Sequence, residues 1–478
     1  MSLRKHAISG VKWNFGAQAG QQIAQLATMV VLARLLKPSD FGLVGMATVV
    51  TAFVSLFKDL GTSAAIIHRR DLTDELLSSV FWMNVGIGIL GTLLLASFAP
   101  LVAMYYREPQ VSAILRVLSL SFAISGLTIL QAALLERGLQ FRTVASTQLA
   151  GVGCGAIAGI ASALAGAGVW ALVIQSLTSA SVITILLWWS TPWRPQWIFR
   201  WREVRSIGSY SLNLVGFNTF NYFSRNADNL LIGRYLGPTA LGIYALAYRI
   251  MLYPLQTIAT VISRVMFPVY AHLQDDDARF RSAYLRTAGV IALVTFPMMI
   301  GLWMVARPFV LTVFGAKWLQ LVPLIEILAP IGMLQSIGTT VGAIYQAKGN
   351  TRALFYWGIG SGAVLVSGFA VGLRWGIVGV ATTYAIVTIG LMIPNFVIPF
   401  RLIGLRLRSL VAVLVRPLAA SLLMALVIAV VRTLVVHSQP HFALQLMLAT
   451  GILVYIFASW QMDRDQFRQV LALLGGKL

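Results

Sequence analysis

Apolar stretches of about 20 residues recur along the chain from Trp13 almost to its C-terminal end, and short loops separate them. A helix of roughly 20 apolar residues crosses the hydrocarbon core of a bilayer, which is about 30 Å thick. A chain that repeats such a segment many times satisfies its backbone hydrogen bonds in lipid by forming helices. The pattern therefore predicts an all-α polytopic membrane protein.

The number of stretches predicts about fourteen transmembrane helices. Their expected spans are 13–34, 42–66, 79–104, 111–134, 145–166, 169–190, 207–233, 240–264, 283–305, 321–346, 354–373, 376–400, 411–433 and 442–460. Polar residues interrupt the first stretch, so we expect a retained helix and not a cleavable signal. Composition agrees, because only 11% of the 478 residues are charged, whereas a water-soluble domain has about 25%.

The basic residues indicate how the chain sits in the membrane. The formal net charge is +21, but the bases are scattered between apolar helices and form no nucleic-acid-binding patch, so we expect no nucleic-acid partner. About two thirds of the 36 Lys and Arg residues fall on one side when the N-terminus is placed in the cytoplasm. The positive-inside rule then predicts that both termini are cytoplasmic, which requires an even number of helices. We expect the protein in a bacterial inner membrane.

Several classes of function are disfavoured by what the chain lacks. The outer loops are short and carry almost no carboxylates, which argues against a membrane glycosyltransferase or polymerase. No phosphate-binding G-x-x-x-x-G-K-[ST] motif occurs, so the chain itself is not expected to use ATP. Its single cysteine, Cys154, offers neither an internal disulfide nor a thiolate metal site. We therefore expect a secondary-type transporter without cofactor or metal, and not an enzyme.

The two halves of the chain share a repeat at an offset of 200 residues. The matching pairs are Arg34/Arg234, Leu36/Leu236, Pro38/Pro238, Gly42/Gly242 and Ala47/Ala247. Proline and glycine identify the repeat as a turn between helices. Six helices per half then predict two lobes in parallel orientation.

The resulting domain prediction has four parts. Residues 1–192 form an N-terminal lobe, 193–206 an amphipathic linker, 207–402 a C-terminal lobe, and 403–478 two extra helices with a cytoplasmic tail. The linker mixes tryptophans and arginines from Trp193 to Arg205, a composition suited to the cytoplasmic headgroup region. Recruitment of a cytoplasmic partner is the alternative.

Two of the predicted helices carry matching polar stripes. In the first, the polar residues are spaced 4, 3, 4 and 3 apart, which places them on one face: Asn14, Gln18, Gln21, Gln25 and Thr28. In the seventh, Asn218, Asn221, Arg225 and Asp228 occupy equivalent positions. Such faces must meet protein or water, so we expect a hydrated cavity between the lobes. Packing of the amides between helices is the structural alternative.

The ionisable residues at membrane depth are Lys58, Asp59, Arg225, Asp228, Arg249 and Glu326. Arg249 has no carboxylate within a helical turn and lies among tyrosines, including Tyr248. Arginine binds phosphate oxygens through paired N–H donors, and aromatic rings pack on sugar faces. Asp59, Asp228 and Glu326 are the candidates for ion coupling, although Arg225 and Asp228 could neutralise each other.

Several motifs together resemble the multidrug/oligosaccharidyl-lipid/polysaccharide (MOP) superfamily. They are Ser9–Trp13, Leu32–Leu43, Asp59–Arg69, Tyr244–Arg249, Arg264–Asp275 and Phe314–Trp318. Within the superfamily the chain looks most similar to Wzx-type polysaccharide flippases and their colanic-acid exporter branch, over roughly residues 1 to 400. The resemblance implies alternating access, a two-lobed cavity with cationic residues, and transport of an undecaprenyl-diphosphate-linked oligosaccharide to the periplasmic leaflet.

We therefore hypothesise that Arg225 and Arg249 bind the diphosphate. The amides of Gln18, Gln21, Gln25, Asn218 and Asn221 would contact sugar hydroxyls, and Tyr248 would pack on a sugar ring. Expected partners are the lipid-linked oligosaccharide, membrane lipids, and the polysaccharide polymerase and export machinery. Two alternatives stay open: a cation-coupled drug or small-molecule antiporter of the same superfamily, and a membrane scaffold that transports nothing.

Overall fold

A computed structural model describes residues 3–58, 62–69, 71–205, 212–435 and 438–462. The side chains of residues 3–15, 17, 64, 68, 203, 212–221, 256–265, 267 and 268 lie outside this description. Every regular element in the described part is helical, and the chain divides into two compact units, Met1–Gly242 and Ile243–Leu478. The predicted all-α polytopic class is confirmed. The four-part domain division stays a prediction.

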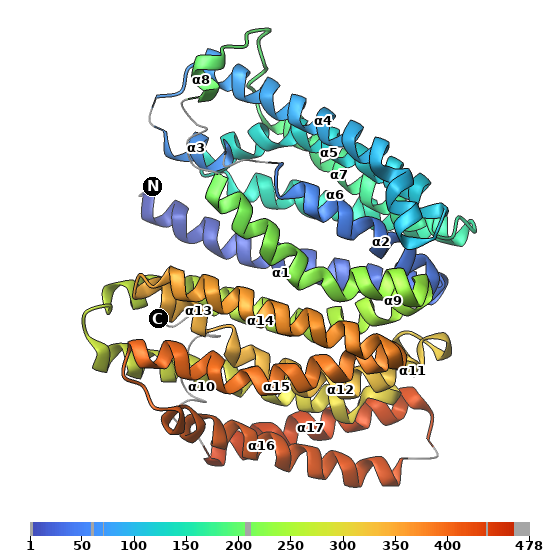
Figure 1. Ribbon diagram of the computed structural model, residues 1–478, viewed down its shortest axis with the longest axis vertical. Coiled ribbons are helices and arrows are strands. Elements are labelled where there is room, and N and C mark those ends of the chain that lie inside the picture. Colours follow the sequence, from blue (N-terminus) through green and yellow to red (C-terminus); the bar gives the residue numbers. More distant parts are fainter. Residues whose placement is uncertain (1–2, 59–61, 70, 206–211, 436–437, 463–478) are drawn as a thin grey trace. The chain divides into compact units, whose positions relative to one another are not determined.

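The first unit contains helices α1 (Leu3–Leu35), α2 (Pro38–Ser55), α3 (Thr62–His68), α4 (Asp74–Tyr106), α5 (Gln110–Arg137), α6 (Phe141–Leu164), α7 (Trp170–Ser190) and α8 (Trp201–Arg205). Helices α4 and α5 pack side by side, as do α6 and α7, and α1 lies against α6 (Figure 1). The long helix α9 (Leu212–His272) begins in this unit and ends in the next. It breaks at Gly237, whose φ of 85° is a left-handed value that glycine adopts without strain.

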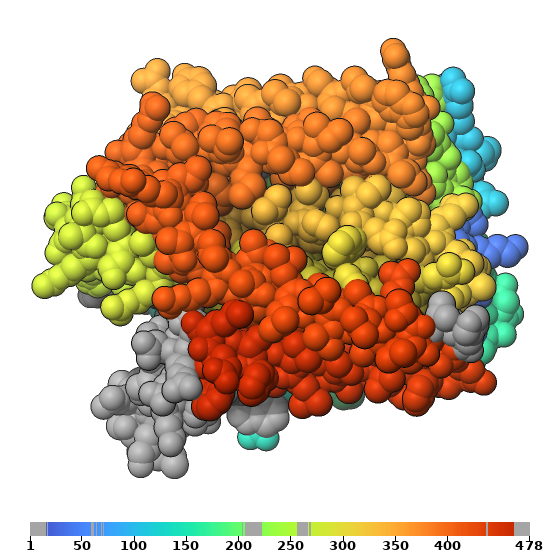
Figure 2. All heavy atoms as spheres, turned by 90° about the horizontal axis from the view of Figure 1, so that it is seen from below, coloured from blue at the N-terminus to red at the C-terminus, as the bar shows by residue number. Residues whose placement is uncertain are grey.

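The second unit continues with α10 (Asp277–Met304), α11 (Ala306–Val313), the 3₁₀ turn η2 (Ala316–Trp318), α12 (Leu321–Gly338), α13 (Val341–Ala347), α14 (Thr351–Gly372), the 3₁₀ turn η3 (Leu373–Trp375), α15 (Gly376–Leu402), α16 (Leu407–Leu434) and α17 (Pro440–Met462). Helix α10 packs on α12 and α16, while α15 packs on α12 and α14. The last two helices, α16 and α17, cover one side of this unit (Figure 2).

Among the described residues, eleven segments are long and apolar enough to cross a membrane. Two of them cover two predicted spans each, because Tyr222–Leu255 runs through the break in α9 and Thr351–Leu402 contains both α14 and α15. Helix α1 is not among the eleven, since its glutamines lower its hydropathy. Every predicted span is largely helical in the described part, but the count of fourteen stays a prediction.

Short polar side chains start several of the helices. Thr73 accepts a hydrogen bond from the Leu76 backbone N–H at 3.2 Å before α4, and Asp276 accepts one from Arg279 at 3.0 Å before α10. These caps satisfy backbone donors that the first helical turn leaves without an intrahelical partner. They mark where loops end and membrane helices begin.

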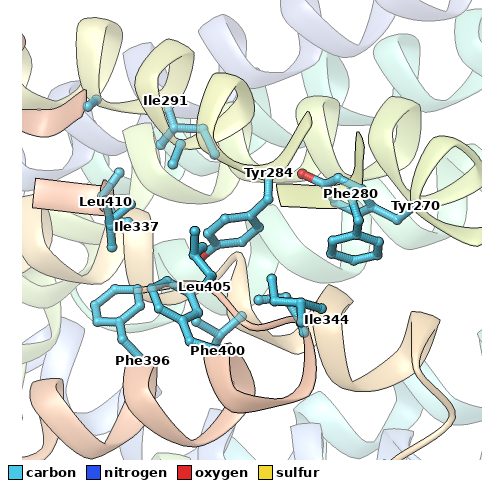
Figure 3. Packing of buried hydrophobic residues seen from close by; sticks show 14 of the residues in the cluster. Tyr270, Phe280, Tyr284, Ile291, Ile337, Ile344, Phe396, Phe400, Leu405 and Leu410 are labelled. Carbon is cyan, nitrogen blue, oxygen red and sulfur yellow. The ribbon is translucent and has the colours of Figure 1, made fainter. Parts of the chain in front are cut away.

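The largest described core cluster of the second unit joins α9, α10, α12, α13, α15 and α16 (Figure 3). Phe280, Tyr284, Phe396 and Phe400 are at most 1% exposed, and the rings of Tyr284 and Phe400 meet edge to face at 5.5 Å. The Tyr284 hydroxyl is 2.8 Å from the hydroxyl of Thr340, so its polar atom is satisfied inside the cluster. This cluster fixes one end of the second unit.

The predicted linker is held against the start of α4. The backbone N–H groups of Gln196 and Arg200 donate to the hydroxyls of Ser78 and Ser79 at 3.0 and 2.9 Å. The Trp82 indole donates to the Gln196 carbonyl at 2.8 Å. The linker is therefore hydrogen-bonded to the N-terminal part of α4.

The repeated turn makes a reciprocal contact within the first unit. A Cβ atom at Gly42 would collide with the Pro238 carbonyl oxygen, and one at Gly242 would collide with the Pro38 carbonyl oxygen. Both positions are buried. The turn before α2 and the turn inside α9 thus cross backbone to backbone, which only glycine at both positions allows.

Candidate functional site

The glutamine face of α1 forms as the spacing predicted. Helix α1 is continuous, so residues three and four apart share a face. Gln18 is exposed, Gln21 and Gln25 are half-buried, and Thr28 is buried with its hydroxyl donating to the Ala24 carbonyl at 2.7 Å. The glutamine side chains are therefore at least partly accessible, whereas the Thr28 hydroxyl at the C-terminal end of the face is hydrogen-bonded within the helix.

The first half of α9 packs on α2 and presents Arg225. The rings of Phe53 and Phe223 lie 4.9 Å apart, and the Tyr222 hydroxyl donates to the Val49 carbonyl. Arg225 is exposed. The side chains of Asn218 and Asn221 lie outside the described residues, so their role stays a prediction.

Asp228 differs from Arg225 in its surroundings. Its side chain is 2% exposed, and it accepts a hydrogen bond from the Asn229 backbone N–H at 2.7 Å. A buried carboxylate in a membrane helix requires such donors. Asp228 therefore belongs to the interior of the first unit, unlike the exposed guanidinium three residues earlier.

Arg225 and Arg249 lie at equal distances along α9 from its break. Each is twelve residues from Gly237, which corresponds to about 18 Å of helix at 1.5 Å per residue. Half of a hydrocarbon core is about 15 Å, so this distance is comparable with half the thickness of a bilayer. Both side chains are exposed, and a charged side chain within a membrane helix is stable only against water, protein or a charged ligand.

The second unit holds a group of aromatic and amide side chains around Tyr248, the residue before Arg249. Tyr248 and Tyr384 approach through their hydroxyl oxygens at 3.3 Å, and the Gln335 amide donates to the Tyr384 hydroxyl. The rings of Tyr244 and Tyr248 stack at 6.0 Å, and Phe369 stacks on Tyr384 at 5.9 Å. Helices α9, α12, α14 and α15 each contribute to this group.

Sequence reasoning identified Tyr248 but missed Gln335 and Tyr384. A signal for Tyr384 was present, because Tyr384 and Asn395 are the two largest polar side chains of the predicted span 376–400 and lie on one helical face. Asn395 accepts a hydrogen bond from the Trp357 indole at 3.0 Å. Tyr384 and Asn395 of α15 are thus both paired with side chains of neighbouring helices.

The coupling candidates are not brought together by the described residues. Asp59 lies outside them, and Asp228 is buried in the first unit. Glu326 is exposed and lies five residues into α12, about 8 Å from its start. No group of three His, Cys, Asp or Glu side chains suited to a metal ion occurs in the part of the chain that the structure describes.

Known proteins share this sequence and fold. A family described as "Polysaccharide biosynthesis protein" matches residues 31–323. The teichuronic acid biosynthesis protein TuaB of Bacillus subtilis (strain 168) is 31% identical over 469 residues, covering 95% of each chain. The chain belongs to the polysaccharide biosynthesis protein family. The lipopolysaccharide biosynthesis protein WzxC of Escherichia coli (strain K12) is 28% identical over 396 residues, covering 81% of this chain and 80% of that protein.

Solved structures show where this family stands among membrane folds. The lipid II flippase MurJ in an inward closed conformation superposes with a TM-score of 0.75 at 16% identity, covering 95% of this chain and 99% of that one. An inward-facing multidrug resistance MATE family transporter of the MOP superfamily gives 0.64 at 18% identity, covering 80% and 94%. The resemblance to Wzx-type polysaccharide biosynthesis proteins is confirmed, and the fold is the one that MurJ and this transporter of the MOP superfamily share. The chain is a multi-pass membrane protein with the fold of these transporters, which are not enzymes.

Proposed function

We propose that the protein translocates undecaprenyl-diphosphate-linked oligosaccharide repeat units from the cytoplasmic to the periplasmic leaflet by alternating access. The observation that carries the proposal is the pair of exposed arginines, Arg225 and Arg249, each about 18 Å from the break in α9. A diphosphate needs cationic donors when it leaves the headgroup region, and guanidinium groups bind phosphate oxygens in a bidentate way. Membership of a polysaccharide biosynthesis family supports a sugar-bearing lipid as the substrate.

The α1 face supplies hydrogen-bonding groups for the sugars. Gln18, Gln21 and Gln25 are at least partly accessible, and carboxamides both donate to and accept from hydroxyls. Asn218 and Asn221 have the same proposed role on the first half of α9. In this proposal the lobes 1–192 and 207–402 move against each other, 193–206 connects them, and 403–478 adds the final helices.

The decisive experiment measures flipping in proteoliposomes. The probe is the undecaprenyl-diphosphate oligosaccharide that accumulates in cells deleted for this gene, and its accessibility is followed with and without a proton or sodium gradient. Gradient-dependent flipping would implicate the coupling candidates Asp59, Asp228 and Glu326. A wild-type protein that is folded and moves no probe under any gradient would contradict the proposal and favour the antiporter or scaffold.

Arginine variants test the assignment of the diphosphate site. Charge-assisted hydrogen bonds contribute about 1.5–3 kcal/mol, so Arg225→Ala and Arg249→Ala should each lower the flipping rate roughly 10- to 100-fold. The control is Arg374→Ala, because Arg374 is an exposed arginine in the η3 turn outside the helices. Equal flipping by Arg249→Ala and the control would remove Arg249 from the site.

We also propose an inner-membrane location with both termini in the cytoplasm. Cys154 is the chain's single cysteine, so a Cys154→Ala background permits labelling at one introduced position. Gln110 and Gln140 are exposed at opposite ends of α5. A membrane-impermeant maleimide added to intact spheroplasts should label Gln110→Cys and not Gln140→Cys, and the reverse pattern would invert the topology.

A further inference from the structure

The aromatic and amide group of the second unit has a chemistry that a diphosphate site does not require. We call Tyr248, Gln335 and Tyr384 the tyrosine–glutamine cluster. Its three side chains come from α9, α12 and α15 and join through the hydroxyl of Tyr384, which lies 3.3 Å from the Tyr248 hydroxyl and accepts from Gln335. None of the three carries a formal charge at neutral pH.

The burial of the three side chains gives them different positions in the cluster. Tyr384 is 4% exposed and is enclosed by Phe369 on one ring face. Tyr248 and Gln335 are only half-buried, so each has one accessible side. The arrangement is a buried hydroxyl that holds two partly accessible groups in place.

This combination matches the surface of a sugar. A sugar ring offers apolar C–H faces, which pack on aromatic rings, and hydroxyls, which pair with amides and phenols. Ligand sites in proteins typically combine aromatic walls with a few fixed polar groups. Arg249 follows Tyr248 in α9, so the two side chains leave the helix at nearly the same height, on faces about 100° apart.

We propose that the tyrosine–glutamine cluster is a sugar-recognition subsite that distinguishes glycosylated from unglycosylated lipid carrier. Tyr248 and Gln335 contact the sugar, and Tyr384 is a positioning residue. The inference rests on the proposed function and extends it, because it separates sugar selectivity from diphosphate binding. Polar side chains also join membrane helices without binding a ligand, and that role predicts a different result in the same experiment.

The experiment compares two probes on the purified full-length protein in nanodiscs. They are undecaprenyl diphosphate and the undecaprenyl-diphosphate oligosaccharide that accumulates in cells deleted for this gene. Gln335→Leu and Tyr384→Phe should each weaken binding of the glycosylated probe roughly 5- to 30-fold, the range expected for lost hydrogen bonds. The Kd for undecaprenyl diphosphate should stay within about twofold of wild type.

Tyr284→Phe is the matched control. It removes a tyrosine hydroxyl that is also hydrogen-bonded between helices of the same unit, to Thr340, but Tyr284 is fully buried in the core cluster (Figure 3). The control should lower thermal stability without separating the two affinities. Gln335→Asn, which keeps the amide on a shorter side chain, replaces Gln335→Leu if the latter does not fold.

The outcomes separate the two proposals. Equal weakening of both probes, or no weakening of either, in folded cluster variants would overturn the subsite and leave the cluster as a contact between helices. A wild-type protein that binds undecaprenyl diphosphate and the glycosylated probe equally would also overturn it. A wild-type protein that binds neither probe would instead overturn the proposed function on which the subsite rests.

Discussion

Pro297 interrupts the hydrogen bonding of α10, and a neighbouring helix supplies the missing donor. In an α-helix the backbone N–H of residue i+4 donates to the carbonyl of residue i, but proline has no N–H. The Leu293 carbonyl therefore loses its intrahelical donor. The Tyr455 hydroxyl of α17 donates to this carbonyl at 2.6 Å. We predict that Tyr455→Phe destabilises the second unit because it leaves that carbonyl without a donor.

The magnitude follows from the cost of an unsatisfied buried group. Leaving a buried acceptor unpaired costs about 1–3 kcal/mol, and interhelical hydrogen bonds in membranes contribute up to about 1.7 kcal/mol. We therefore expect Tyr455→Phe to lower the free energy of unfolding by about 1–2 kcal/mol. In a Pro297→Ala background the helix regains its own N–H donor, so the same change should cost less than about 0.5 kcal/mol.

Equilibrium unfolding in mixed detergent and SDS micelles, followed by tryptophan fluorescence, measures both costs. The four proteins of the cycle are wild type, the two single variants and the double variant. The difference between the two costs is the coupling energy, about 1 kcal/mol in this account. Equal costs in the two backgrounds would refute the idea that Tyr455 compensates for Pro297.

Three further predictions concern the first unit. Gly42→Ala should lower the free energy of unfolding by about 1–3 kcal/mol, and with it the melting temperature, because the added methyl group would collide across the reciprocal turn contact. Gly45→Ala, whose added Cβ atom would have its nearest neighbour at 3.5 Å, should be nearly neutral in the same thermal assay. The Arg137 guanidinium donates to two carbonyls at the end of α3. Arg137→Lys should release this helix and speed maleimide labelling of an Ile67→Cys reporter, and an unchanged labelling rate would contradict that role. The Thr92 hydroxyl donates to a carbonyl of α5 at 2.8 Å and accepts from an N–H of the same helix at 3.2 Å. Thr92→Val should therefore lower the free energy of unfolding by about 1–2 kcal/mol, while Thr92→Ser should retain most of the stability.

The helices could be predicted from sequence because lipid imposes a local rule. An apolar stretch must satisfy its own backbone, so its length and composition nearly determine its structure. The turn at Pro38 and its counterpart at Pro238 were recognisable for a similar local reason. The break after α2 was not predicted, although the charged residues Lys58 and Asp59 interrupt the apolar stretch 42–66 close to it.

The candidate site was predictable only where it depends on a single helix. The α1 glutamines and Arg225 follow from helical spacing. Gln335 and Tyr384 could not be linked to Tyr248, because 49 residues separate the first two and 136 separate Tyr248 from Tyr384. The linker shows the same limit, since the hydroxyls of Ser78 and Ser79 that accept from Gln196 and Arg200 come from a distant helix and carry no sequence signal.

The reciprocal crossing of the two turns has the geometry of a homodimer interface. In an isologous contact the same patch occurs on both copies, so that residue i touches residue j and j touches i. Pro38 lies against Gly242, and Pro238 lies against Gly42, at equivalent positions of the 200-residue repeat. A half-length chain carrying one such turn would possess both sides of the contact and would be able to pair with its own copy. Separately expressed halves therefore offer a direct way to ask whether this turn alone encodes self-association, independently of any transport.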